Sequence, residues 1–244
     1  MLTARKLSYC LLFALGFLLY AHVLFAQADS SYADEKDTSA HPCTGDPYLK
    51  PPVFIIPGIF FVYSGLKSFS GEIQKFDDSL YTGVVKNHAS FHTNAEDYLM
   101  WSPSAAVYIM DALHLKTQHN FKEHLILDAS SILITGGVGY AMRLISKQIP
   151  AYTAYPTKFP SGHTANAFRS AEFLHQELKH LSPVVSYSGY VIATTVGILR
   201  IYNKDHLLSE VVTGAGLGIL STKFTYWLFD KIRCKRKRMA INRE

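Results

Sequence analysis

The chain has 244 residues, enough for one helical domain with a full core and extensions at its ends. Its formal net charge of +5 is local, because the C-terminal end alone carries Lys231, Arg233, Lys235, Arg236, Lys237 and Arg238. No nucleic-acid-reading motif or aromatic platform accompanies these basic residues, so nucleic acid is excluded as a partner. The 3 cysteines, one of them (Cys10) inside an apolar N-terminal run, are too few for a disulfide framework.

The N-terminus has the pattern of a secretory signal. Arg5 and Lys6 precede an apolar run from Leu7 to Phe25, and Ala26-Gln27-Ala28 supplies small residues at the distance of a cleavage site. Residues 1–28 are therefore predicted to be a signal peptide, with Asp29 as the mature N-terminus. An uncleaved anchor helix is the alternative, because the run is long enough to span a bilayer.

The rest of the chain reads as helical. Residues 29–52 are polar and are expected to form a flexible leader. Beyond them, the periodicity and length of the apolar stretches are typical of helices, and few runs alternate as strands do; these stretches are 53–66, 98–115, 122–148, 164–181, 184–202 and 207–232. The predicted class is all-α. Residues 67–97 mix Gly, Asp, Asn and aromatic residues, which indicates a long connection that covers the mouth of a site.

The relation of these helices to a membrane is open from the sequence. Leu125–Ile145 and Val211–Phe229 are long enough to span, whereas the helix from Thr164 carries too many polar groups to face hydrocarbon. We expect an exported, periplasmic and membrane-associated domain, with an integral membrane protein as the alternative. The basic tail, 233–244, suits a cytoplasmic flank or an anionic membrane surface.

Three glycines near the C-terminal end, Gly214, Gly216 and Gly218, resemble a dinucleotide-binding loop only superficially. No strand precedes them and the third is at the wrong spacing. Small residues at these positions instead favour close packing of two helices.

Candidate site residues lie in two motifs. In the first, Phe-Pro-Ser-Gly-His at 159–163, the Ser161 hydroxyl and the Gly162 amide can donate to phosphate oxygens at a helix N-terminus, which favours an anion. His163 is placed to protonate a leaving oxygen. In the second, Arg200 offers a planar fork of donors that matches phosphate. His206 follows as the candidate nucleophile, and Glu210, one turn further, can fix its tautomer.

These motifs resemble those of the type 2 phosphatidic acid phosphatase and vanadium haloperoxidase superfamily, whose pattern is K-x6-R-P, then P-S-G-H, then S-R-x5-H-x3-D. The second block is complete here, and the third keeps Arg200 and His206 at the family's spacing. Leu199 replaces the family's Ser, and Glu210 replaces its Asp. The resemblance covers roughly residues 95–230. It implies a six-helix bundle, with 53–232 as the phosphatase-like helical domain.

The first block departs from the family pattern. Anchoring on Pro150 puts Ile149 at the family's Arg and Met142 at its Lys, so two phosphate-binding cations are missing from their usual places. Nearby basic side chains are available as substitutes, namely Lys158, Arg143 and Lys147. We include Lys158 and Arg143 among the expected substrate-binding residues, with Arg200, Ser161 and Gly162.

The resemblance implies a metal-independent acid phosphatase that acts through a phosphohistidine on His206, without a cofactor. The export signal, the apolar helices and the basic tail favour a phosphorylated lipid as substrate over another phosphate ester. One alternative is a catalytically impaired relative that binds phosphorylated lipid head groups or acts as a structural partner. A haloperoxidase is less favoured, because its vanadate site relies on a full set of cations.

Overall fold

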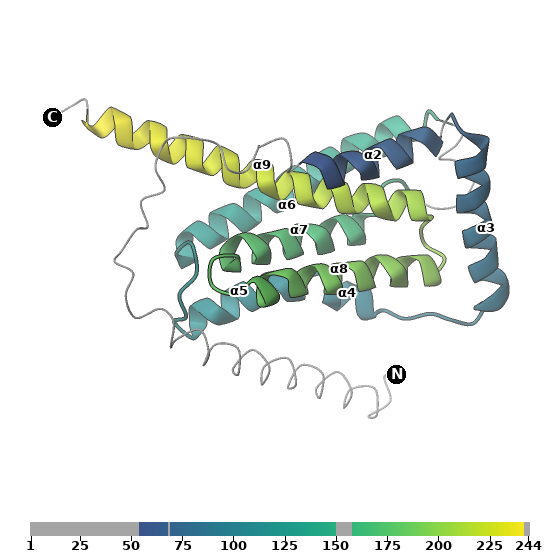
Figure 1. Ribbon diagram of the computed structural model, residues 1–244, viewed down its shortest axis with the longest axis horizontal. Helices are drawn as coiled ribbons and strands as arrows, with labels where there is room; N and C mark the ends of the chain where they lie inside the picture. The colour runs from purple at the N-terminus through teal and green to yellow at the C-terminus, as the bar shows by residue number, and fades with distance from the viewer. Residues whose placement is uncertain (1–53, 68, 150–157, 242–244) are drawn as a thin grey trace.

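The computed structural model describes residues 54–67, 69–149 and 158–241. The predicted signal peptide, its cleavage site and the leader lie outside these ranges. Every regular element in the described part is a helix (Figure 1), namely α2 (Ile55–Lys67), α3 (Gly71–Asn87), α4 (Ala95–Leu99), α5 (Ser102–Ala112), α6 (Phe121–Ser146), α7 (Gly162–Leu178), α8 (Pro183–Tyr202) and α9 (Leu208–Ile241).

The all-α class is confirmed, and the described part contains two helices more than the six that the sequence predicts. The six apolar stretches correspond to α2 and to α5 through α9. The additional helices, α3 and α4, lie in 67–97, which the sequence suggested was a connection. In addition, α9 continues to Ile241, so most of the predicted basic tail is helical.

Local sequence signals fix where three long helices begin. Asn120 and Glu123 form a reciprocal capping box at the start of α6. Ser161 caps α7, and Ser182 caps α8 with Pro183 at the first helical position. Each cap accepts a hydrogen bond from a first-turn amide that has no partner within its helix.

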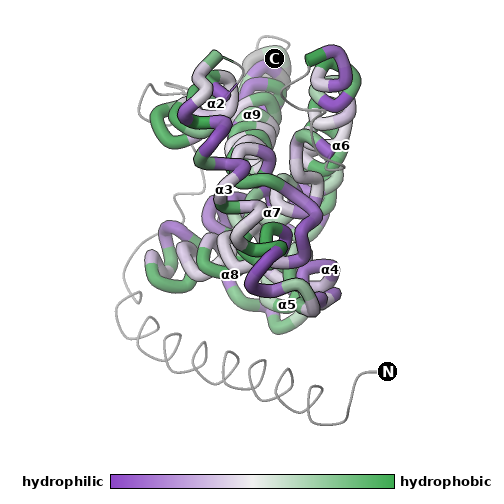
Figure 2. The backbone as a smooth tube through the Cα atoms, turned by 90° about the vertical axis from the view of Figure 1, so that its right-hand side faces the viewer, coloured by the Kyte–Doolittle hydropathy of each residue, from purple (hydrophilic) through white to green (hydrophobic). Residues whose placement is uncertain are grey.

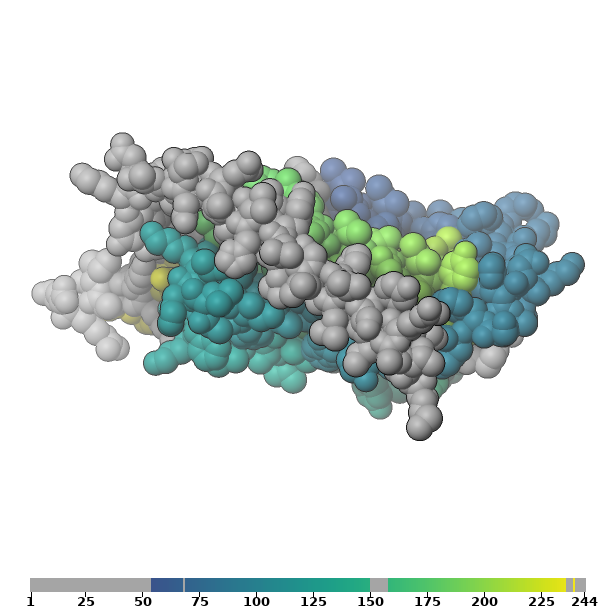
Figure 3. Space-filling view, turned by 90° about the horizontal axis from the view of Figure 1, so that it is seen from below, coloured from purple at the N-terminus to yellow at the C-terminus, as the bar shows by residue number. Residues whose placement is uncertain are grey.

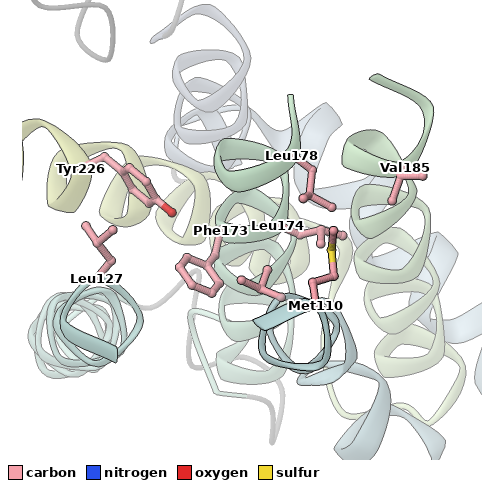
Figure 4. Close-up of a cluster of buried hydrophobic side chains, with 8 residues drawn as sticks. Met110, Leu127, Phe173, Leu174, Leu178, Val185 and Tyr226 are labelled. Atoms are coloured by element: carbon pink, nitrogen blue, oxygen red, sulfur yellow. The ribbon is translucent and has the colours of Figure 1, made fainter. Parts of the chain in front are cut away.

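Helix α7 is the centre of the bundle. Figure 2 shows it between α2, α9 and α6 on one side and α8, α5 and α4 on the other. In Figure 3 parts of α5 and α8 are visible on the face seen from below, and α3 lies at one end of it. Apolar side chains from these helices meet around Phe173 (Figure 4), and the buried cluster comprises Val107, Met110, Leu127, Phe173, Leu174, Leu178, Val185 and Tyr226.

The polar side chains of α7 are buried and paired inside the bundle. Arg169 donates to Ser131 and forms an ion pair with Asp128. Glu177 accepts hydrogen bonds from the rings of His119 and His124. Burial alone would raise the pKa of Glu177, but these hydrogen bonds lower it to about 2. The polar groups of α7 thus face protein partners, as the sequence predicted when it excluded this helix from contact with hydrocarbon.

Glycines let α9 approach α7 at backbone distance. A Cβ built on Gly214 would lie 2.6 Å from the carbonyl oxygen of Ser161, and one built on Gly218 would lie 2.2 Å from that of Ala165. These separations are shorter than any side chain tolerates, so glycine is required at both positions. The interpretation of these glycines as a helix-packing surface is confirmed.

Two helices of the described part, α6 and α8, are long and apolar enough to cross a bilayer. Helix α6 contains the predicted run Leu125–Ile145. The second predicted run, Val211–Phe229, lies in α9, which is not among these two helices; most of its residues are buried, and α9 packs against α7 and α2. Pro183–Tyr202 takes its place as the second apolar helix.

Candidate active site

The predicted phosphate-binding turn lies at the N-terminus of α7. Ser161 is fully buried, and its hydroxyl contacts the hydroxyl of Thr164 at 2.9 Å while capping the helix. Its own amide donates to the carbonyl oxygen of Glu210 at 3.1 Å. Gly162 is exposed, and a Cβ built on it would meet nothing within 4 Å. Open space therefore adjoins the first-turn amides of α7, where an anion is favoured.

His206 and Glu210 form the predicted pair at the start of α9. The His206 Nδ1 atom lies 2.8 Å from Glu210 Oε2, which also accepts from the Leu207 amide at 3.3 Å. Both side chains are buried. The predicted hydrogen-bond contact is confirmed, with a glutamate at the position of the family's aspartate. Because Nδ1 is engaged, Nε2 is the nitrogen available for attack.

Arg200 lies in the last turn of α8, between two carboxylates. Its NH1 atom is 3.2 Å from Glu96 Oε1 and 3.0 Å from Asp205 Oδ2. Its Nε is buried and has no hydrogen-bond partner among the described residues. The guanidinium is thus anchored through one nitrogen and keeps donors for an incoming ligand.

His163, in the first turn of α7, contacts a carboxylate that the sequence analysis did not single out. Its Nε2 atom is 2.8 Å from Asp97 Oδ1, and the two side chains are 32% and 51% exposed. Asp97 and its neighbour Glu96 belong to the short helix α4. Both carboxylates lie within 67–97, where the local sequence gave no sign of contacts with residues 66 and 104 positions away.

Successive contacts connect all of these residues at one end of the bundle. His163 meets Asp97, whose neighbour Glu96 pairs with Arg200, and Arg200 pairs with Asp205 beside His206. His206 pairs with Glu210, whose carbonyl accepts from Ser161, two residues before His163. The structure therefore brings together Ser161, His163, Arg200, His206 and Glu210.

Of the three candidate substitute cations, the packing register of the helices favours Arg143. Glu123 pairs with Arg233, and a Cβ on Gly139 would touch Leu217, so α6 and α9 run antiparallel. In this register, one further turn of α6 brings Arg143 about level with Thr213, the residue before Gly214. The Nε of Arg143 is buried without a hydrogen-bond partner in the described part of the chain.

The other two cations are more exposed. Lys158 is an exposed residue just before the buried Phe159-Pro160-Ser161 turn, and Lys147 is an exposed residue at the C-terminal end of α6. The positions where the family has its cations, Met142 and Ile149, are both partly buried. Arg143 is therefore the least exposed of the three candidate cations.

Helix α3 contacts the start of α9 and the connection between α8 and α9. Asp77 accepts from the Ser209 amide at 3.1 Å and forms a buried ion pair with Lys67 at 2.9 Å. Tyr81, one turn further along α3, donates to the carbonyl oxygen of Lys204 at 3.3 Å. Burial, then the charges of Glu210 and Asp205, raise the pKa of Tyr81. The segment 67–97 thus packs directly on the α8–α9 connection that carries His206.

Comparison with known proteins gives three matches. The family model of the PAP2 superfamily matches residues 116–234. A lipid A 1-phosphatase from Porphyromonas gingivalis is 30% identical over 225 residues, which is 88% of this chain and 49% of that protein. The chain therefore spans about half the length of this curated relative. The crystal structure of a transmembrane PAP2 type phosphatidylglycerolphosphate phosphatase from Bacillus subtilis has 20% sequence identity and a TM-score of 0.41, over 72% of this chain and 97% of that one.

The matched segment contains both motifs on which the resemblance was based. His163 lies at the start of α7, Arg200 at the end of α8, and His206 just before α9, all between residues 116 and 234. Helix α4, which supplies Glu96 and Asp97, lies before the matched segment. Residues 116–234, which contain both motifs, match the model of the PAP2 superfamily, as the resemblance of these motifs indicates.

Proposed function

We propose that this protein is a metal-independent phosphatase that hydrolyses a lipid phosphate monoester or diphosphate through a phosphohistidine. The observation that carries the proposal is the His206–Glu210 contact of 2.8 Å at the same end of the bundle as Arg200, His163 and the N-terminus of α7. A neutral imidazole with one nitrogen held by a carboxylate presents the other as a nucleophile. Arg200 and the first-turn amides of α7 can donate hydrogen bonds to the phosphoryl oxygens.

In the first step, Nε2 of His206 attacks phosphorus and the ester P–O bond breaks. His163 gives its proton to the leaving oxygen, so the alcohol departs neutral. Arg200 and the first-turn amides of α7 hold the phosphoryl oxygens as charge develops on them. Glu210 stabilises the positive charge that His206 acquires on forming the P–N bond.

In the second step, water attacks the phosphohistidine. His163, now neutral, takes a proton from the water as the new P–O bond forms. The P–N bond breaks and its electrons return to His206, which regains its starting form. Inorganic phosphate leaves and His163 is again protonated, so the cycle is balanced without any other reactant.

The lipid nature of the substrate is supported by the molecular surface and by the relatives. Apolar side chains are exposed along the two long apolar helices, among them Leu133 at 75% on α6 and Val191 at 69% on α8. Such faces suit a protein that associates with a membrane. The named relatives are a lipid A 1-phosphatase and a phosphatidylglycerolphosphate phosphatase, both of which have lipid substrates in their names.

Export to the periplasm is supported by Cys234, which is disulfide-bonded. Disulfides persist in oxidising compartments and are rare in the cytosol. Cys234 lies within the basic C-terminal segment of α9. This placement favours contact of that segment with an anionic membrane surface from the oxidising side over a cytoplasmic flank.

The alternative, a catalytically impaired protein that binds phosphorylated head groups, is favoured by one observation. Arg200 is shared by Glu96 and Asp205, while Met142 and Ile149 replace the family's first-block cations. Each charge-assisted hydrogen bond is worth roughly 1.5–3 kcal/mol, so uncompensated loss of two would cost on the order of a hundred- to ten-thousand-fold in rate.

The experiment that separates these functions measures phosphate release and the intermediate together. The purified chain is given lipid phosphates in detergent micelles, and the phosphoenzyme is trapped from labelled substrate. We expect turnover and an acid-labile phosphoenzyme in the wild type, and neither in His206→Ala. Binding of phosphorylated lipids without any turnover that depends on His206 would instead establish the binding protein.

A further inference from the structure

Helix α4 brings two adjacent carboxylates to the two halves of the site. Glu96 is buried and pairs with Arg200, the anchor for phosphate. Asp97 is 51% exposed and contacts His163, which is 32% exposed, at 2.8 Å. The contact between Glu96 and Arg200 is therefore inside the protein, whereas the contact between Asp97 and His163 is accessible to solvent. A proton donor must be both accessible to substrate and correctly oriented, and the pairing of His163 with Asp97 meets both requirements.

The connection between α8 and α9 holds the segment just before α4, and this fixes the position of Asp97 relative to His163. The Asn203 side chain pairs with the backbone of Thr93, accepting from its amide at 3.0 Å and donating to its carbonyl oxygen at 2.8 Å. The Lys204 ammonium donates at 3.3, 2.8 and 3.0 Å to the carbonyl oxygens of His88, Ala89 and Phe91. Lys204 has φ of 66°, a conformation that costs energy for a non-glycine residue and persists only where surrounding contacts enforce it.

We infer that Asp97 is a positioning residue for the general acid. An ionised carboxylate only accepts, so the Nε2 of His163 carries a hydrogen that it donates to Asp97. The ring is then held in one orientation, and Nδ1 is the atom that delivers the proton to the leaving oxygen and later receives one from water. This inference rests on the proposed function, in which His163 protonates the leaving oxygen.

The positioning role of Asp97 can be tested with two substrates that differ in their leaving group. Proton donation matters for an alkyl phosphate, whose alkoxide is a poor leaving group, and matters little for p-nitrophenyl phosphate, whose phenolate leaves unprotonated. Asp97→Ala should therefore lower kcat/KM, which reports the steps up to the phosphohistidine, by roughly 10- to 100-fold on an alkyl phosphate and leave kcat/KM on p-nitrophenyl phosphate nearly unchanged. His163→Ala should show the same selectivity with a larger loss. The double variant should be no slower than His163→Ala, because both act on one proton transfer.

Asp205→Ala is the matched control, because Asp205 is a similarly exposed aspartate, at 40%, that pairs with Arg200. It should change both substrates by the same factor. Asp97→Asn keeps the shape and an acceptor oxygen, so it should show the same selectivity with a smaller loss, even if the alanine variant is poorly folded.

Equal losses on the two substrates for Asp97→Ala and Asp97→Asn, or a loss that multiplies with that of His163→Ala, would overturn the positioning role while leaving the phosphatase intact. A wild type without His206-dependent turnover of either substrate would overturn the proposed function, and this inference with it.

Discussion

The proposed phosphate site depends on a few charged side chains that are close together. The carboxylates of Glu96 and Asp205 both contact Arg200, and Glu210 lies beside His206. A phosphate approaching Arg200 would therefore compete with two internal anions for one cation. A second positive charge would offset this, and Arg143 is the least exposed of the three candidate cations.

We therefore expect Arg143→Ala to lower kcat/KM for a soluble phosphate monoester by roughly 10- to 100-fold, the equivalent of one charge-assisted hydrogen bond to phosphate. Lys147→Ala, one turn further along α6 and exposed, should have little effect. Lys158→Ala tests the remaining candidate. If Lys158→Ala were as damaging as Arg200→Ala while Arg143→Ala remained active, the substitute cation would be Lys158. The assay is steady-state phosphate release, with circular dichroism to check folding.

Glu210→Gln tests the tautomer of His206. The amide oxygen of glutamine can still accept from Nδ1, but the negative charge that stabilises the charged ring is lost. We expect kcat to fall by roughly a hundred-fold or more, with little change in phosphate affinity. Measuring kcat and the inhibition constant of inorganic phosphate separates the two effects. A loss confined to phosphate affinity would contradict the assigned role of Glu210.

At the scale of elements, the contact between α7 and α9 determines the geometry of the site. Ser161 rests on Gly214, and Gly218 rests on Ala165, so both helices are held at backbone distance over two turns. The proposed phosphate-binding turn and the proposed nucleophile, His206, belong to opposite sides of this contact. Its integrity therefore affects folding and activity together.

Gly218→Ala should destabilise the protein by about 3 kcal/mol or more, because the new methyl meets backbone that cannot rotate away. Gly136→Ala, in the middle of α6, is the matched control. A Cβ there meets nothing within 4 Å, and alanine favours helix, so stability should rise by up to about 1 kcal/mol. Chemical denaturation followed by circular dichroism measures both. Equal stabilities of the two variants would contradict the close helix contact.

The sequence predicted the six helices that correspond to apolar stretches, because the length and periodicity of those stretches are typical of helices. It also predicted the His206–Glu210 contact from their spacing of four residues, although His206 precedes the first residue of α9, Leu208, and the contact is made at the helix start and not along one helix face. It did not predict α3 as a helix, since the buried residues of α3 are only Asp77 and Val84 and its apolar pattern is weak. Asp97 escaped notice because its role depends on a contact with His163, 66 positions away, that no local pattern encodes.

For the whole molecule, the state of Cys234 and the position of the mature N-terminus bear on where the protein resides. We expect mass spectrometry of the protein purified from its native host to show a chain that begins at Asp29. Cys234 should resist alkylation until a reductant is added, because it is disulfide-bonded. An intact Met1 would favour the anchor helix. A Cys234 that is alkylated without reduction would argue against an oxidising environment.

The joint between α7 and α9 also constrains how substrate reaches the site. The Ser161 amide is bonded to Glu210 and the Ser161 carbonyl rests against Gly214, so no passage can open between these two helices without breaking the fold. Asp77 and Lys67 seal the side of α9 that faces α3. The partly exposed pair of Asp97 and His163 marks a side that is accessible to solvent. We therefore expect substrate to enter and phosphate to leave beside α4.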